Sequence, residues 1–138
     1  MSVGTLSERL GIELVEASAE RVVATMPVPG NTQPYGLLHG GASVALAETL
    51  GSYGAALHAG PGRQAVGVEI SASHHRGVRD GVVTGRATAV HLGSTTATYE
   101  IVVEDSRSRR VCTARLTCLL LDARGDDQRA IDATSPRD

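Results

Sequence analysis

The chain has 138 residues, of which 41% are hydrophobic and 20% are charged, and its formal net charge is −2. This length and composition are typical of one folded domain spanning 1–138, and they exclude a disordered chain. With no Phe, no Trp and no excess of basic residues, the sequence lacks the features of a nucleic-acid-binding or membrane-surface protein.

Turn residues divide the chain into two strands, one long helix and four further strands. A segment rich in Pro, Gly and Asn precedes the helix, and the segment AGPG ends it. The predicted strands are 12–17, 21–28, 64–73, 82–90, 95–104 and 110–121, and the predicted helix runs from 36–41 to about His58. The segment 122–138, rich in Asp and Arg, is predicted to be a mobile tail outside a core that spans about 10–121.

This order of elements predicts an α+β fold, in which an antiparallel sheet wraps around the single helix. The last strand supports a sheet with two different faces, because its side chains alternate in character. Cys112, Ala114, Leu116, Cys118 and Leu120 point one way, and Thr113, Arg115 and Thr117 point the other.

The N-terminal segment, the hydropathy of the chain and its two cysteines bear on its location in the cell. The N-terminal segment MSVGTLSERLG has no basic region followed by an apolar run, so we expect no signal peptide, and no stretch is apolar enough to predict a membrane span. Cys112 and Cys118 are six residues apart in a predicted strand, roughly 20 Å, which is too far for a disulfide bridge. Two free thiols predict a cytoplasmic protein.

The predicted helix carries an isolated carboxylate. Glu48 is the single formally charged side chain between positions 22 and 62. Leu46, Leu50, Tyr53 and Leu57 recur at helical spacing and predict the face that packs on the sheet. Glu48 lies about 200° around the helix from Leu46, and therefore faces away from that core.

The neighbours of Glu48 on the helix decide between two interpretations of this charge. An exposed helical Glu is ordinary, but a solvated face normally carries other charged residues. The face of Glu48 instead consists of small, uncharged side chains: Gly41, Val44, Ala45, Ser52 and Ala55. A second subunit or a ligand is therefore expected to cover this face, and the cost of covering a charge favours a functional role for Glu48.

The helix begins at His39-Gly40-Gly41. The unsatisfied backbone N–H groups of a helix N-terminus suit a developing oxyanion, and glycines let a substrate carbonyl approach closely. The alternative is that the glycines only form a tight turn. No Gly-Lys-Ser/Thr follows, which excludes a phosphate-binding loop, and the spacing of His39 and Glu48 with no third ligand predicts no metal site.

Three polar turns remain. The segment SASHHRGVRD, 71–80, concentrates positive charge at a strand end, which fits either phosphate binding or an ordinary solvated loop. The segment SRSRR, 106–110, predicts a solvated hairpin tip. The segment HLGSTT, 91–96, predicts either a plain turn or part of a ligand rim.

Taken together, QPYGLLHGGASVALAETLGS, GVEISASHHRG and AVHLGSTTATYEIVVED resemble the motifs of the hotdog-fold acyl-CoA thioesterases. The resemblance covers roughly 10–121. It is closest to the branch that contains the phenylacetate-pathway (PaaI-like) enzymes, the Arthrobacter-type 4-hydroxybenzoyl-CoA thioesterases and 1,4-dihydroxy-2-naphthoyl-CoA hydrolase.

The resemblance implies that two subunits pair into a continuous sheet, that the pairs assemble into tetramers, and that each active site lies between subunits. It implies that Glu48 is the catalytic general base or nucleophile, and that the N–H of Gly40 from the partner subunit holds the thioester oxygen. Gln33 and His39 would position the thioester or the water, and Ser52 would line the site. No cofactor is implied.

The resemblance also implies contacts with the CoA moiety of the substrate. These would come from Gly67, His74, His75, Arg76, Gly77, His91, Leu92, Gly93, Ser94, Thr95 and Thr96. Relatives often carry Pro where this chain has Gly77. The expected activity is hydrolysis of an aromatic or bulky acyl-CoA, 1,4-dihydroxy-2-naphthoyl-CoA being one candidate. The alternatives are a hotdog hydratase or dehydratase and a non-catalytic acyl-CoA-sensing module.

Overall fold

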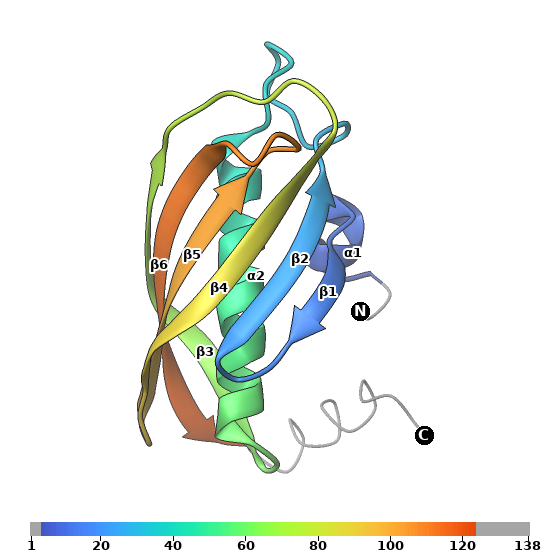
Figure 1. The fold of residues 1–138 in the computed structure, drawn as a ribbon. Helices are drawn as coiled ribbons and strands as arrows, with labels where there is room; N and C mark the ends of the chain where they lie inside the picture. Colours follow the sequence, from blue (N-terminus) through green and yellow to red (C-terminus); the bar gives the residue numbers. More distant parts are fainter. Residues whose placement is uncertain (1–3, 124–138) are drawn as a thin grey trace.

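The structure is a computed structural model, and it describes residues 4–123. Six strands and one long helix follow each other in the predicted order (Figure 1). Their bounds are α1 Leu6–Leu10, β1 Glu13–Ala17, β2 Arg21–Pro27, α2 Gly40–Ala59, β3 Arg63–His74, β4 Val82–Leu92, β5 Thr96–Glu104 and β6 Arg110–Asp122. The predicted mobile tail lies almost wholly outside the described residues.

The strands form one antiparallel sheet in the order β1-β2-β4-β5-β6-β3, which curves around α2 (Figure 1). The predicted α+β architecture is confirmed. Helix α1 was not predicted: Thr5 caps the N-terminus of its five residues, and Gly11, with φ of 74°, caps the C-terminus. Within the described part of the chain, no helix is long and apolar enough to cross a membrane.

The core lies between the sheet and α2 and is mostly aliphatic. Its aromatic member is Tyr99, which is fully buried and donates a 2.5 Å hydrogen bond to the carbonyl of Ala19 in the β1–β2 turn. Burial, helped by the nearby Cys118 and Glu20, raises the pKa of Tyr99 to about 12. The neutral hydroxyl is therefore the form that the fold retains.

Strand β6 has the two faces that its sequence predicts. Its inward side chains are buried, and among its outward ones Arg115 is exposed. Cys112 and Cys118 are both buried and free, as expected. Burial raises the pKa of each thiol, so both resist ionisation.

The predicted core face of α2 is half wrong. Leu46 and Leu50 are fully buried, but Tyr53 and Leu57 are 40% and 46% exposed. The buried arc continues instead through Gly51 and Gly54, where an added Cβ would lie 2.6 Å from Leu116 and 2.8 Å from Tyr99. Since a glycine adds nothing to a hydrophobic stripe, this close helix–sheet contact gives no periodic signal.

The opposite face of α2 also differs from the prediction at one residue. Ala55, expected beside Glu48, is fully buried in the core. Gly41, Val44, Ala45 and Ser52 are exposed or half-buried, as is Glu48 itself. Glu48 therefore does face away from the sheet's core, as its position on the helix predicted.

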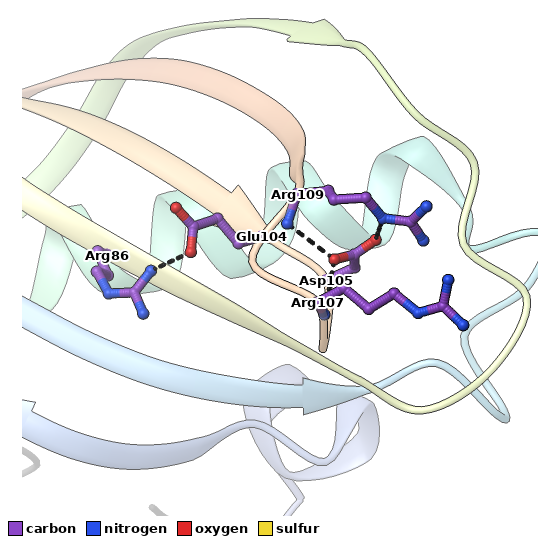
Figure 2. A network of polar contacts seen from close by, with 5 residues as sticks. All are labelled: Arg86, Glu104, Asp105, Arg107 and Arg109. Atoms are coloured by element: carbon purple, nitrogen blue, oxygen red, sulfur yellow. Dashed lines mark hydrogen bonds and ion pairs between the residues drawn. The ribbon is translucent and has the colours of Figure 1, made fainter.

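The β5–β6 turn is organised by one carboxylate (Figure 2). Asp105 accepts hydrogen bonds from the backbone N–H groups of Arg107 and Arg109 and from the Arg109 guanidinium, at 2.8–2.9 Å. Burial alone would raise the pKa of Asp105, but these donors hold it below its usual value. Arg86 and Glu104 form a separate ion pair on the neighbouring strands. The segment 106–110 is exposed, as predicted for a hairpin tip.

Candidate active site

Glu48 projects from the uncovered face of α2. It lines an open cavity of about 480 Å³ together with Leu6, Ala45, Thr49, Ser52, Tyr53 and Ala56. Among the residues that the structure describes, none gives Glu48 a hydrogen bond or an ion pair. A half-buried carboxylate without such a partner is unusual, because loss of solvation is normally offset by donors or cations.

The sheet leaves room for this carboxylate at Gly67. A Cβ at Gly67 would lie 2.6 Å from Oε1 of Glu48, so only glycine allows the side chain its position. The β3–β6 pairing shifts register between Gly67 and Glu69, which marks a bulge at this point. Below Glu48, the Ser52 hydroxyl lies 4.0 Å from the buried Cys118 thiol. The charge of Glu48 adds to the effect of burial in raising the pKa of that thiol.

The N-terminus of α2 presents an unused donor. His39 is the N-cap, and its Nδ1 accepts the N–H of Gly41 at 2.8 Å. The carbonyl of His39 accepts the N–H groups of Ala42 and Ser43. The N–H of Gly40 has no acceptor within residues 4–123, so it is free to bind a ligand oxygen. Because Nδ1 of His39 is an acceptor here, its neutral ring carries the proton on Nε2.

The loop before α2 is fixed by Asn31, which is buried. The side-chain amide of Asn31 donates to the carbonyls of Leu10 and Pro27 at 2.7 and 2.8 Å, and the backbone carbonyl of Asn31 accepts the N–H of His39. Leu38 donates its N–H to Val78. The helix start is thereby attached both to the end of α1 and to the β3–β4 loop.

A second cavity, of about 410 Å³, opens at this end of α2. It is lined by Gln33, Leu37, Leu38, Gly40, Ser43, His74, His75, Arg76, Gly77 and Val111. The ring of His74 packs against Gly40, where an added Cβ would lie 3.0 Å from Nε2. His75 is turned outward and hydrogen-bonds Thr113 at 2.9 Å. Gly77 packs against Leu37, where an added Cβ would lie 3.0 Å from the Leu37 side chain.

The structure brings some of the candidate residues together and keeps others apart. Gln33 and Gly40 share the second cavity with 74–77, whereas Glu48 and Ser52 line the first. The segment 91–96 lies at the other end of α2, where His58 hydrogen-bonds the carbonyl of Gly93 at 2.7 Å. A helix of 20 residues is about 30 Å long, so one chain does not unite all the candidates.

Some lining residues were not among those predicted from the sequence. Ser43 enters the second cavity, and Leu6 and Thr49 enter the first. Ser43 lies three residues after Gly40 and Thr49 lies four after Ala45, so helical spacing indicates both, whereas the sequence of α1 gave no signal. His74 was expected to contact CoA, and its contact with Gly40 depends on the long-range position of β3. In residues 4–123, no group of three metal-binding side chains is close enough to hold an ion.

Comparison with known proteins bears on what this arrangement does. Residues 35–112 match the family model of the thioesterase superfamily. The chain is 52% identical over 121 residues to the proofreading thioesterase EntH of Cronobacter turicensis, which covers 87% of this chain and 88% of the relative.

Solved structures agree. A thioesterase from Haemophilus influenzae superposes with a TM-score of 0.83 at 40% identity, over 87% of this chain and 85% of that one. A variant of a thioesterase from Pseudomonas aeruginosa superposes with a TM-score of 0.82 at 40% identity, over 87% of this chain and 88% of that one. A Staphylococcus aureus protein superposes with a TM-score of 0.82 at 31% identity, over 86% of this chain and 100% of that one. These neighbours share an antiparallel sheet wrapped around a central helix.

Proposed function

Since the chain belongs to the thioesterase superfamily and is a thioester hydrolase with the hotdog fold, we propose that it hydrolyses an aromatic or bulky acyl-CoA at a site between two subunits. The products are the free acid and CoA. 1,4-Dihydroxy-2-naphthoyl-CoA is one candidate substrate, and the phenylacetate-pathway branch is the proposed subfamily.

The observation that carries this proposal is the separation of two unsatisfied groups. The Glu48 carboxylate has no partner and the Gly40 N–H has no acceptor in the described chain, yet they line different cavities. A second copy would bring Gly40 of one subunit to Glu48 of the other. Strand β3 offers a place for that copy, because it pairs with β6 alone and exposes Val66 and Val68 along its outer edge.

The chemistry follows from these groups. The Gly40 N–H at the positive end of α2 stabilises the negative charge that develops on the thioester oxygen. Glu48 either removes a proton from the attacking water or attacks the carbonyl itself to form an anhydride that water then opens. In both routes the C–S bond breaks and the thiolate of CoA takes a proton. The water oxygen ends in the acid when water attacks the acyl carbonyl, and in Glu48 when water attacks the Glu48 carbonyl of the anhydride.

The remaining residues orient the reactants. Gln33 lies in the cavity of Gly40, so its amide is available to the thioester or the water. His74 packs against Gly40 and is available to the same oxygen. His39 is occupied as the helix cap through Nδ1 and offers its Nε2–H. Ser52 lies beside Glu48, and Arg76 with the segment 91–96 is proposed to contact CoA.

One relative supports the choice of Gln33 and Glu48. The Staphylococcus aureus thioesterase has been solved as a glutamine-to-alanine variant and as a glutamate-to-alanine variant, and the two substituted positions are fifteen residues apart. Gln33 and Glu48 have the same spacing in this chain.

The proposal is tested by release of free thiol from a panel of aromatic and aliphatic acyl-CoAs. We expect turnover by the wild type and a fall in kcat of about 10²–10⁴ for Glu48→Ala, the range that loss of a general base typically produces. Equal turnover by both proteins would exclude a catalytic Glu48. CoA binding without thiol release would favour the sensing module, and hydration of an enoyl-CoA would favour the hydratase. After a single turnover in ¹⁸O-water, label in Glu48 would identify it as the nucleophile.

Mixing two inactive variants tests the shared site. Glu48→Ala and Gln33→Ala subunits are unfolded together and refolded at equal amounts. If each site takes Glu48 from one subunit and Gln33 from the other, random pairing restores about a quarter of the wild-type sites. No recovery, with mixed dimers demonstrated by differently tagged subunits, would mean that both residues act within one chain.

A further inference from the structure

The last turn of α2 is tied to the turn between β4 and β5. His58 lies in that last helical turn, and its Nε2 is 2.7 Å from the carbonyl oxygen of Gly93. A carbonyl oxygen only accepts hydrogen bonds, so the imidazole donates and carries a proton on Nε2. A side chain at 93 would not fit, because an added Cβ would lie 2.6 Å from Nε2 of His91 and 2.9 Å from the carbonyl oxygen of Thr96.

Two backbone hydrogen bonds complete the β4–β5 turn. The N–H of Gly93 donates to the carbonyl of Thr96, and the N–H of Leu120 in β6 donates to the carbonyl of Thr95, both at 2.9 Å. The N–H groups of Ser94 and Thr95, by contrast, have no acceptor within the described part of the chain. Both residues are exposed. The turn therefore has its carbonyls bound to the protein and two of its N–H groups left for a ligand.

The contact with His58 also sets the direction of one of these N–H groups. The peptide bond between Gly93 and Ser94 is trans, since the described chain contains no cis peptide bond. In a planar trans peptide the C=O and the N–H point in opposite directions. Because the Gly93 carbonyl points at His58 on α2, the Ser94 N–H points away from α2. These contacts lie within one chain, so this direction does not depend on what a second subunit adds.

A fixed N–H beside two exposed hydroxyl groups suits a phosphate group. Successive backbone N–H groups in a turn form a typical binding site for anions, and the side chains of Ser94 and Thr95 add two further donors. In the proposed substrate, CoA is the part that carries phosphates. A donor that is already ordered binds more tightly than a mobile one, because less conformational entropy is lost on binding.

We infer that His58 is a positioning residue, which binds the Gly93 carbonyl and thereby holds the Ser94 N–H toward a phosphate group of CoA. This inference rests on the proposed function, since it takes 91–96 as part of the CoA site. His58 itself lies outside the residues that were predicted to form the site. Its loss should therefore weaken binding of the nucleotide part of the substrate and leave the chemical step unchanged.

Two matched thioesters test this role. The acyl group that the wild type hydrolyses fastest is attached to CoA and to pantetheine, which lacks the phosphates. For His58→Ala we expect KM for the acyl-CoA to rise about tenfold with kcat unchanged, as for loss of an interaction that serves binding alone. KM for the acyl-pantetheine should stay the same. His58→Gln keeps an N–H donor on the side chain and should restore most of the affinity for the acyl-CoA.

Tyr99→Phe is the matched control for a purely structural role. The Tyr99 hydroxyl also donates to the carbonyl of a turn, that of Ala19 between β1 and β2, without touching 91–96. Both variants lose one hydrogen bond between a side chain and a turn, so both should lower the melting temperature. The ratio of the two KM values should change for His58→Ala alone. A change of that ratio of equal size in Tyr99→Phe would overturn the inference.

Ser94→Pro tests the donor directly, because proline has no N–H and is common in turns. Alone, it should raise KM for the acyl-CoA about tenfold, the effect of one lost hydrogen bond to a charged group. Added to His58→Ala, it should raise KM little further, because both changes remove the same interaction. Two effects that multiply in full would mean that His58 does not act through Ser94.

Calorimetry with CoA itself gives a second measurement, independent of turnover. We expect His58→Ala to raise the Kd for CoA about tenfold, in line with its effect on KM. If the wild type binds CoA but releases no thiol, hydrolysis fails, and this change in Kd still decides the inference. If the wild type neither binds CoA nor releases thiol, both proposals fail. If the wild type is active but His58→Ala leaves Kd and KM unchanged, or raises KM equally for both thioesters, the function stands and His58 does not position a phosphate-binding group.

Discussion

The two faces of α2 show two different uses of small residues. On the face toward the sheet, Gly51 and Gly54 let Leu116 and Tyr99 approach so closely that a Cβ would collide with them. On the opposite face, Ala45 and Ser52 leave an open cavity beside Glu48. Small residues therefore allow close packing on the first face, and they leave an open cavity on the second.

The polar groups on the two faces differ in the same way. The Tyr99 hydroxyl under the sheet-facing side has its acceptor at Ala19. The Glu48 carboxylate on the open side has no partner within residues 4–123. A stable core satisfies its polar groups, whereas a site that must bind something leaves one unsatisfied. Substitutions on the two faces should therefore affect different measurements.

The largest effect is expected at Gly67, which touches the open face. Gly67→Ala would push the Glu48 carboxylate from its place, and a displacement of about 1 Å at a reacting group can reduce kcat by about 10². The melting temperature should change little, because Gly67 is exposed. Ser73→Ala on the same strand is the control. A large loss of stability with kcat unchanged would show that Gly67 is needed for packing and not for the position of Glu48.

Gly54→Ala tests the sheet-facing side. The new Cβ would lie 2.8 Å from two ring carbons and the hydroxyl oxygen of Tyr99, whose side chain is buried and hydrogen-bonded to Ala19. Overpacking of this kind costs about 1–3 kcal/mol of unfolding free energy, partly offset by the better helix propensity of Ala. Urea unfolding measures the loss. In combination with Tyr99→Leu the loss should be less than additive, and strict additivity would mean that the ring is not the obstacle.

Tyr99→Phe removes the hydroxyl that binds Ala19 and should cost about 1 kcal/mol. Because the pKa of Tyr99 is raised from 10.0 to about 12, its contribution is complete below pH 10 and is lost as the pH rises toward 12. The difference in unfolding free energy between wild type and variant should therefore shrink over that range. A difference that stays constant from pH 9 to 12 would contradict the raised pKa.

The smallest change in unfolding free energy is expected for Glu48→Gln. The carboxylate has no donor or cation in the described chain, so its neutral replacement should leave the unfolding free energy equal or slightly higher. Chemical denaturation at neutral pH would detect the change. A clear destabilisation would reveal a structural role and would weaken the contrast between the two faces.

The order of strands and the position of α2 could be predicted because alternation, helical spacing and Gly- or Pro-rich turns are local signals. The orientation of Glu48 followed from the same periodicity. Helix α1 was missed, since five residues are too few to show a period. The core face was misjudged at Tyr53 and Leu57 because Gly51 and Gly54 carry the contact.

The candidate site was harder to predict than the fold. Its cavities combine residues that are distant in sequence, such as His74 with Gly40 and Leu6 with Tyr53. Their proximity depends on the register of β3 against β6 and on the link from Asn31 to Leu10. Neither is a periodic feature of a single segment, so the motifs indicated the chemistry without the geometry.

The burial of Tyr99 also has a spectroscopic consequence, because the tyrosines are the protein's main near-ultraviolet chromophores. The sequence has no Trp and three tyrosines, and these occupy three different settings: Tyr35 in an exposed loop, Tyr53 in the cavity that contains Glu48, and Tyr99 in the core. Near-ultraviolet dichroism should therefore report mainly the rigid Tyr99 ring, while tyrosine emission should respond to whatever covers Tyr53. Folding of the core and occupancy of the cavity beside Tyr53 can therefore be followed in one unlabelled sample.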